Sequence, residues 1–316
     1  MNIVILDGGT TNPGDVSWDA ISALGSLTVY DSTLPEQVIS RGRDAEALII
    51  NRIALTRETL SQLPKLRFIG MLATGYNTVD TAAARELGIE VCNVPFYCVE
   101  MVAQQAFTLL LSLCGNVHRY SEKVRAGKWQ EAVAMNYREY PLFELYGKTL
   151  GIVGYGSIGR CMAKLGLALG MDILLYSRTK KEAPEGCRWV GLDDLFAQSD
   201  VVTLHCPLNE STAGLVNARL LSLMKPTALL INTSRGGVVD SAALADALNS
   251  GRLAGAGVDV MAQEPPVADD PLLTAKNCVI SPHISWASKE ARERLIGVVA
   301  ENLRAFQNGK PQNVVN

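Results

Sequence analysis

The hydrophobic residues of the chain fall into short apolar runs, separated by longer segments in which apolar positions recur every three or four residues. The short runs predict strands and the longer segments predict helices. In the N-terminal third we expect strands at 2–7, 26–30, 47–51, 66–71 and 90–93, and helices at 15–24, 34–41, 56–62 and 81–87. This alternation indicates a parallel sheet with helices on both faces.

A second series of elements begins at residue 149. Apolar runs predict strands at 149–153, 173–176, 201–205, 228–233 and 256–260, with a helix at 161–169. The chain is therefore expected to form two α/β domains, each large enough to bury a core.

Residues 100–119 separate the two series. They are strongly apolar and contain neither Gly nor Pro before Gly115, which predicts one long helix. Its surface is hydrophobic almost all round, as is typical of burial between domains or in a subunit interface. Residues 120–146 are richer in charged and aromatic side chains, and we expect an arm or connecting segment there.

Three glycines with the spacing G-x-G-x-x-G, at Gly154, Gly156 and Gly159, follow the first strand of the second series. The first permits a tight turn, the second lets a pyrophosphate approach the backbone, and the third lets the next helix pack on its strand. The phosphates would meet the free N–H groups near Ser157 and Ile158. This pattern predicts a Rossmann domain with a doubly wound parallel sheet, in addition to a second, smaller flavodoxin-like α/β domain.

The composition of the chain disfavours several classes of binding partner. The chain is 48% hydrophobic and 19% charged, as in an ordinary soluble enzyme, and its net charge of -3 without runs of one sign disfavours nucleic acid and membrane surfaces. The N-terminus does not resemble a signal peptide, and no apolar run is long enough to span a bilayer. Seven dispersed cysteines indicate reduced thiols in the cytoplasm, and three unclustered histidines argue against a metal site.

The residues after the strand at 173–176 should contact the adenosine ribose of a dinucleotide. An Asp or Glu there would bond the 2′-hydroxyl of NAD. This chain has Ser177, Arg178 and Thr179 instead, followed by Lys180 and Lys181, so a 2′-phosphate meets hydroxyls and cations rather than a carboxylate. We therefore favour NADP(H), and a solvated basic turn with NAD(H) bound is the alternative.

Polar residues also follow the other strands, at the carboxyl ends where open α/β sheets hold ligands. In the second series these ends carry His205 with Pro207, Thr233 with Ser234, and Asp259, which would define one crevice. In the first series the turn of Ala73, Thr74 and Gly75 follows a strand. Its N–H groups suit a small anion, although a turn shaped only by its own glycine chemistry is the alternative.

Three residues carry the chemistry that a carbonyl reduction needs. Arg235 lies just beyond an apolar strand, and its planar guanidinium suits a carboxylate held by two hydrogen bonds. His283 follows Pro282 after another short strand, and an imidazole is the natural proton donor to a carbonyl oxygen. Glu264 precedes two prolines, and a carboxylate against an imidazole orients it and favours its protonated form.

Four motifs together resemble the D-isomer-specific 2-hydroxyacid dehydrogenase family: GYGSIG at 154–159, NTSRGGVVD at 232–240, GVDVMAQEP at 257–265 and SPHISWAS at 281–288. The resemblance covers essentially the whole chain. It implies that Arg235 anchors the substrate carboxylate and that His283, paired with Glu264, is the acid/base. It also implies that the cofactor site includes Thr233, Ser234 and Asp259, with Asp259 bonded to the nicotinamide carboxamide. His205, Pro207 and Thr212 are further candidates for cofactor contacts.

The resemblance also implies a domain organisation. The substrate domain would be discontinuous, 1–99 plus 288–316, and the dinucleotide-binding domain would occupy 100–287. Members commonly form homodimers through their nucleotide-binding domains, and the long helix near residue 105 takes part.

Within the family, Ser285 and Trp286 stand where Gly-Gly is common, which is similar to the glycerate dehydrogenase or hydroxypyruvate reductase branch. Trp286 would then close the pocket on a short polar substrate, and a plain core aromatic is the alternative. Nothing after Asn316 corresponds to the regulatory domain of many phosphoglycerate dehydrogenases, and the carboxylate of Glu264 disfavours a formate dehydrogenase.

The sequence thus predicts NAD(P)H-dependent reduction of a short 2-oxo acid, hydroxypyruvate or glyoxylate, to the D-2-hydroxy acid. The rival hypothesis is a dinucleotide-sensing scaffold, similar to the corepressors built on the same fold, because fold alone does not decide function. The absence of long disordered tails favours catalysis.

Overall fold

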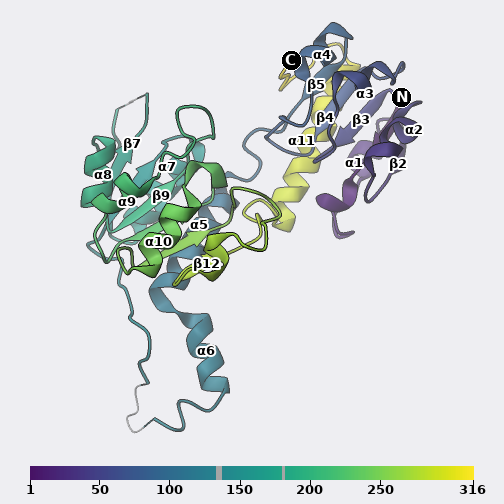
Figure 1. Cartoon of the computed structure of the whole chain (residues 1–316). Helices are drawn as coiled ribbons and strands as arrows, with labels where there is room; N and C mark the ends of the chain where they lie inside the picture. Colours follow the sequence, from purple (N-terminus) through teal and green to yellow (C-terminus); the bar gives the residue numbers. More distant parts are fainter. Residues whose placement is uncertain (133–136, 180–181) are drawn as a thin grey trace. The chain divides into compact units, whose positions relative to one another are not determined.

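The computed structural model describes residues 1–132, 137–179 and 182–316 (Figure 1). The chain divides into two compact units, Met1–Cys98 with Trp286–Asn316, and Val99–Ser285. The backbone therefore leaves the first unit after residue 98 and returns to it after residue 285. The family resemblance places these crossings at 99/100 and 287/288.

The first unit is built on a five-stranded parallel sheet with the strand order β2-β1-β3-β4-β5. This is the order of flavodoxin-like folds, and it confirms the predicted fold of the smaller domain. β3 and β4 are buried at every position, which explains why they read as continuous apolar runs. The strands are β1 (Asn2–Ile5), β2 (Ser26–Val29), β3 (Ala47–Ile50), β4 (Phe68–Met71) and β5 (Glu90–Cys92).

Helices cover both faces of this sheet. Side chains of α2, α3 and α4 share one core with β1, β3, β4 and β5, whereas α11 packs against β4 and α1. Ser288 caps α11 by accepting a hydrogen bond from the N–H of Ala291. The helices are α1 (Asp19–Ser22), α2 (Val38–Gly42), α3 (Arg57–Ser61), α4 (Thr81–Glu86) and α11 (Lys289–Gln307), with short 3₁₀ turns at Gly8–Thr10 and Pro35–Gln37.

The second unit contains a seven-stranded parallel sheet with the order β12-β11-β10-β9-β6-β7-β8. Counted from β6, this is the Rossmann order 3-2-1-4-5-6 with one strand added beyond the sixth, and it confirms the predicted doubly wound domain. The strands are β6 (Thr149–Val153), β7 (Asp172–Tyr176), β8 (Cys187–Trp189), β9 (Val201–Leu204), β10 (Leu229–Asn232), β11 (Gly255–Val258) and β12 (Cys278–Ile280).

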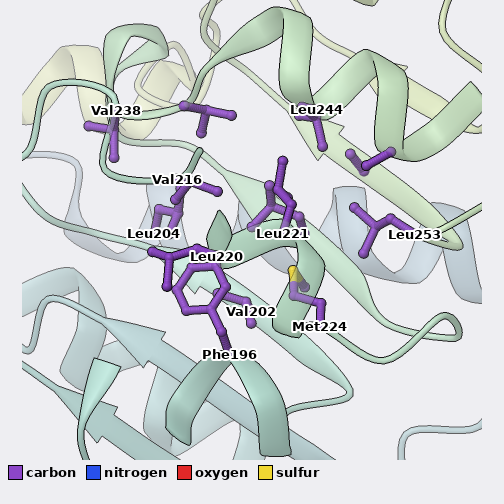
Figure 2. Packing of buried hydrophobic residues seen from close by; sticks show 14 of the residues in the cluster. Phe196, Val202, Leu204, Val216, Leu220, Leu221, Met224, Val238, Leu244 and Leu253 are labelled. Atoms are coloured by element: carbon purple, nitrogen blue, oxygen red, sulfur yellow. The ribbon is translucent and has the colours of Figure 1, made fainter. Parts of the chain in front are cut away.

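Two helical layers enclose this second sheet. Figure 2 shows the core on one face, where Phe196 of α8 and Leu220 of α9 meet Val202 of β9. On the other face, α5 and α7 pack over alternate residues of the same strands. The helices are α5 (Val99–Gly115), α6 (Val117–Arg125), α7 (Ser157–Ala168), α8 (Leu192–Gln198), α9 (Ala218–Leu223) and α10 (Ser241–Asn249), with 3₁₀ turns at Gly236–Val238 and Pro271–Thr274.

The single helix predicted for 100–119 is wrong, because α5 ends at Gly115 and α6 begins at Val117. Asn116 between them has φ 48°, a left-handed conformation that interrupts a helix. Its side-chain amide donates to the carbonyls of Leu113, at 3.2 Å, and Pro141, at 3.1 Å. One apolar face of α5 packs against β10, β11 and α7 of its own unit, whereas Leu111 is exposed, and α6 leads away from the sheet (Figure 1).

Candidate active site

The glycine turn joins β6 to α7 at the carboxyl edge of the second sheet. The N–H of Gly154 donates to the carbonyl at the end of β7, at 2.8 Å, and this bond anchors the turn. A Cβ at Gly159 would lie 2.2 Å from the carbonyl oxygen of Gly154, so only glycine lets α7 start this close to the turn. A Cβ at Gly156 would meet no protein atom within 4 Å, so the turn is open there. The first N–H groups of α7, at Ser157 and Ile158, have no intrahelical acceptor and suit a phosphate.

Two buried polar atoms without a partner among the described residues follow the neighbouring strands β9 and β10. They are Nδ1 of His205 and Oγ1 of Thr233. The other ring nitrogen of His205 contacts Oγ1 of Thr203 at 2.8 Å, and burial lowers the pKa of His205 to about 3, so the ring is neutral. Buried polar atoms normally have a hydrogen-bond partner. Together with the open glycine turn, these atoms fit a nicotinamide dinucleotide bound along the edge of the sheet.

The loop after β9 is shaped by Thr212. Its hydroxyl donates to the carbonyl of Pro207 at 2.6 Å and accepts from the N–H of Asn209 at 2.8 Å. The side chain is buried, so it fixes the course of the loop beside the cofactor candidates. The structure thus gives Thr212 an internal role in addition to the cofactor contact expected from the sequence.

The segment expected to contact the adenosine ribose follows β7. Ser177 is half-buried there, whereas Arg178 and Thr179 are exposed. The guanidinium of Arg178 lies 3.5 Å from Oγ of Ser211, and it forms no ion pair with any carboxylate of the described chain. Lys180 and Lys181 lie outside the described residues.

Arg235 extends from a turn that Asn232 stabilises. Oδ1 of Asn232 accepts from the N–H of Ser234 at 3.0 Å and from its hydroxyl at 2.8 Å, while Nδ2 of Asn232 donates to the carbonyl of Arg235 at 3.0 Å. Arg235 is exposed, and its Nη1 donates to the carbonyl of Ser234 at 2.8 Å. The charged end is therefore accessible to a ligand.

His283 and Glu264 form a direct pair. Nδ1 of His283 lies 2.5 Å from Oε2 of Glu264, and the two side chains are 29% and 27% exposed. Oε1 of Glu264 accepts from the N–H of Met261 at 3.1 Å, which fixes the carboxylate. The imidazole is thus oriented through one nitrogen and half-shielded from water.

Close backbone packing joins the arginine turn to this pair. A Cβ at Gly236 would lie 2.0 Å from the carbonyl carbon and oxygen of Met261, so only glycine permits the contact. The residue before Gly236 is Arg235, and the N–H of Met261 binds Glu264. Arg235, Glu264 and His283 thus follow the neighbouring strands β10, β11 and β12, and the turn of Arg235 is in backbone contact with the segment that leads to Glu264.

Asp259 is buried and follows β11 directly. Its carboxylate accepts from the hydroxyl of Ser281 at 2.5 Å and from the N–H groups of Ile284, at 3.0 Å, and Ser285, at 2.9 Å. Both oxygens are thus bonded to the segment that carries His283. A contact with the cofactor carboxamide would use the acceptor capacity that is left.

The remaining candidates lie in the first unit. Oγ1 of Thr74 donates to the carbonyl of Val94 at 2.7 Å, and Asn93 donates to the carbonyl of Thr74 at 2.8 Å. These bonds and the one from Val94 to Ala73 hold the turn, while the N–H groups of Thr74 and Gly75 meet no acceptor in the described part of the chain. Trp286, half-buried, begins the C-terminal segment of this unit.

Sequence reasoning assigned no role to Asn232 or Ser281. The spacing Asn-x-Ser at 232–234 is typical of an Asx turn, so the role of Asn232 could have been predicted from the sequence. For Ser281 no local signal exists, because its partner Asp259 is distant in the chain. Within residues 1–132, 137–179 and 182–316, no helix is both long and apolar enough to cross a bilayer, and no three His, Cys, Asp or Glu side chains are grouped to hold a metal ion.

Comparison with known proteins gives concordant matches. Residues 107–285 match the family model described as D-isomer specific 2-hydroxyacid dehydrogenase, NAD binding domain. A hydroxypyruvate reductase of Blautia hydrogenotrophica is 47% identical over 100% of both chains, and a glycerate dehydrogenase of Methylorubrum extorquens is 42% identical over 90% of each. The crystal structure of a glyoxylate reductase from Paecilomyes thermophila, 30% identical, superposes with a TM-score of 0.83 over 100% of this chain and 98% of the other. The chain belongs to the D-isomer-specific 2-hydroxyacid dehydrogenase family, oxidoreductases that use a nicotinamide dinucleotide.

Proposed function

We propose that the protein reduces a short 2-oxo acid to the D-2-hydroxy acid, with hydroxypyruvate as the best substrate and glyoxylate as a second one. The names of the relatives, hydroxypyruvate reductase and glycerate dehydrogenase, support this substrate class. The observation that carries the proposal is the 2.5 Å pair of His283 and Glu264, next to the turn of Arg235.

The three side chains divide the work. Arg235 holds the substrate carboxylate, because a guanidinium offers two parallel N–H donors and keeps its charge. His283 gives a proton from Nε2 to the keto oxygen, since Nδ1 is bonded to Glu264. Glu264 fixes the orientation of the ring through its bond to Nδ1. The dinucleotide, when bound, supplies the hydride to the keto carbon.

Residues of the first unit are proposed as substrate ligands on their local geometry. The N–H groups of Thr74 and Gly75, which follow Ala73, suit a carboxylate oxygen. Trp286 offers a large rigid face, which suits a substrate with a short side chain.

We also propose a preference for NADP(H) over NAD(H). The support is that residues 177–179 are Ser, Arg and Thr, so this segment contains no carboxylate that would repel the 2′-phosphate of NADP(H). Substitution of Arg178 by Ala should raise KM for NADPH about tenfold, because the loss of one charge-assisted hydrogen bond corresponds to about that factor in affinity. The KM for NADH should change little. A Ser177→Asp enzyme should turn toward NADH. Steady-state kinetics with both cofactors provide the test, and a wild-type enzyme that favours NADH would contradict the preference.

The substrate assignment is tested by following NADPH and NADH oxidation with glyoxylate, hydroxypyruvate, pyruvate and longer 2-oxo acids. The expected order of kcat/KM places hydroxypyruvate first. Chiral analysis of the product should give the D isomer. Silence with every acid of the panel would exclude the proposed activity.

A homodimer in the cytoplasm completes the proposal. Apolar side chains are exposed on α5, on α6 and on the segment that follows it, as expected of a surface that a second copy covers. Those with the largest exposure are Val117, Leu142 and Tyr146. The cysteines of the described residues form no disulfide bond with one another, which is consistent with a reducing compartment. Sedimentation of wild type and Val117→Asp tests the dimer, since the added charge should shift the protein to monomer.

A further inference from the structure

His283 has a backbone conformation that its side chain disfavours. Its φ is 55°, in the left-handed region where residues with a Cβ are uncommon. Such a conformation persists only when the surrounding contacts determine it, and it clusters at functional sites. The ring direction of His283 therefore depends on whatever holds residues 281–285 in this turn.

Asp259 supplies most of these contacts. Its backbone carbonyl accepts from the N–H of His283 at 2.7 Å. Its carboxylate accepts from the next two N–H groups, those of Ile284 at 3.0 Å and Ser285 at 2.9 Å. One residue thus receives three successive backbone donors, beginning at His283 itself.

The same carboxylate also accepts a hydrogen bond from the residues that precede the histidine. The hydroxyl of Ser281 donates to Oδ1 of Asp259 at 2.5 Å, and Nε2 of Gln105 on α5 donates to that hydroxyl at 3.3 Å. Asp259 is 1% exposed and its own N–H bonds to β10, so the acceptor is rigid. Asp259 therefore binds the turn on both sides of His283, and Gln105 on α5 stabilises the bond between Ser281 and Asp259.

We propose that Asp259, braced by Ser281 and Gln105, is a positioning residue that sets the direction of the His283 imidazole. This inference rests on the proposed acid/base role of His283. It goes beyond the carboxamide contact that the family resemblance implies for Asp259. The two roles have different consequences: a carboxamide ligand controls dinucleotide affinity, whereas a positioning residue controls the rate of proton transfer.

The first test is kinetic and uses Asp259→Asn, Ser281→Ala and the control Asp270→Asn. An amide keeps one acceptor and turns its NH₂ toward a backbone N–H, so at least one bond to the turn is lost. We expect kcat to fall about 100-fold in Asp259→Asn and about 5-fold in Ser281→Ala, as for small misplacements of a reacting group, with dinucleotide Kd within about 3-fold of wild type. Asp270 is also buried and caps a 3₁₀ turn at Leu272, away from the turn of His283, so its variant should keep the wild-type kcat.

A rise in dinucleotide Kd with unchanged kcat in Asp259→Asn would overturn the inference and assign Asp259 to the cofactor. Unchanged kcat and Kd would overturn it as well. If Asp259→Asn fails to fold, Ser281→Ala decides, because it removes one hydroxyl and leaves the carboxylate in place. A wild-type kcat in that variant would then refute the role.

The second test needs no turnover, and so separates this inference from the proposed function. The 2.5 Å bond from His283 to Glu264 should give a downfield imidazole proton resonance, assigned by its loss in Glu264→Gln. We expect this resonance to shift or broaden in Asp259→Asn, with faster amide exchange at 284 and 285, and to stay unchanged in Asp270→Asn. An unchanged resonance in Asp259→Asn contradicts the positioning role. A wild-type enzyme that turns over none of the 2-oxo acids would contradict the proposed function but not the positioning role of Asp259.

Discussion

The buried imidazole of His205 should make the second unit sensitive to acid. Burial lowers the pKa of His205 from 6.5 to about 3, and Nδ1 has no partner among the described residues that would stabilise a charged ring. The unfolded chain binds the proton near pH 6.5, whereas the folded chain stays neutral until about pH 3. Between these values the unfolded state holds more protons, so this contribution to stability is complete above pH 6.5 and is lost as the pH falls.

The magnitude follows from the two pKa values. Each unit of pH below 6.5 costs up to about 1.4 kcal/mol, so the loss relative to pH 7.5 is about 1.4 kcal/mol at pH 5.5 and about 3 kcal/mol at pH 4.5. The variant His205→Gln cannot titrate, and its amide retains a donor toward Oγ1 of Thr203. It should lack this component of the pH dependence while sharing the contributions of all other groups.

Urea unfolding of both proteins at pH 7.5, 5.5 and 4.5 gives the comparison. The chain has two units, so the transition to compare is the one assigned to the second unit by hydrogen exchange. The difference between wild type and variant should change by about 3 kcal/mol over the range, in favour of the variant at low pH. Parallel curves would refute the assignment of a buried neutral imidazole.

Three further results are expected. Gly159→Ala should lower stability by about 2 kcal/mol and also lower dinucleotide affinity, because its Cβ meets a carbonyl oxygen. Gly156→Ala should keep the wild-type melting temperature and lose only dinucleotide affinity. Calorimetry measures the stability of both variants, and fluorescence titration measures their affinity. Arg292 is 7% exposed and binds Asp15 through both terminal nitrogens, at 2.6 and 2.8 Å, so Arg292→Met should lower the urea midpoint of the first unit, and an unchanged midpoint would contradict this. Arg235→Ala should raise KM for the 2-oxo acid about 100-fold in initial-rate assays, the loss of a charge-assisted pair, and an unchanged KM would remove Arg235 from the substrate site.

The two sheets were predictable from the sequence because their inner strands are buried on both faces. β3, β4, β9 and β10 are buried at every position, so each appears as a continuous apolar run bounded by polar residues. β8 gave no such signal, since it is a short edge strand with no buried residue. The confirmed α/β class thus follows from the strands that lie inside each sheet.

Helix limits were less predictable, because they depend on single side-chain contacts. Asn116 is compatible with a helix by propensity, and only its bond to Pro141 shows why the chain turns there. The helix expected at 15–24 is reduced to Asp19–Ser22. Oδ1 of Asn12 accepts from the N–H groups of Gly14 and Val16, which holds the preceding residues in a loop.

The candidate site shows the same division. Motifs identified Arg235, Glu264 and His283 as residue types suited to the chemistry, and their catalytic roles remain predictions. The network of Asp259 was not predictable, because a carboxylate in a motif does not reveal which distant donors occupy it. Its oxygens bind a turn more than twenty residues further along the chain, and that pairing exists only after β11 and β12 align.

Proton transfer by His283 is the step on which the proposed reduction depends, and it is tested by the turnover of His283→Gln with a saturating dinucleotide and 2-oxo acid. Loss of the general acid should reduce kcat by about 10²- to 10⁴-fold, with dinucleotide Kd unchanged. A His283→Gln enzyme that turns over at the wild-type rate would contradict the role of His283 as the general acid.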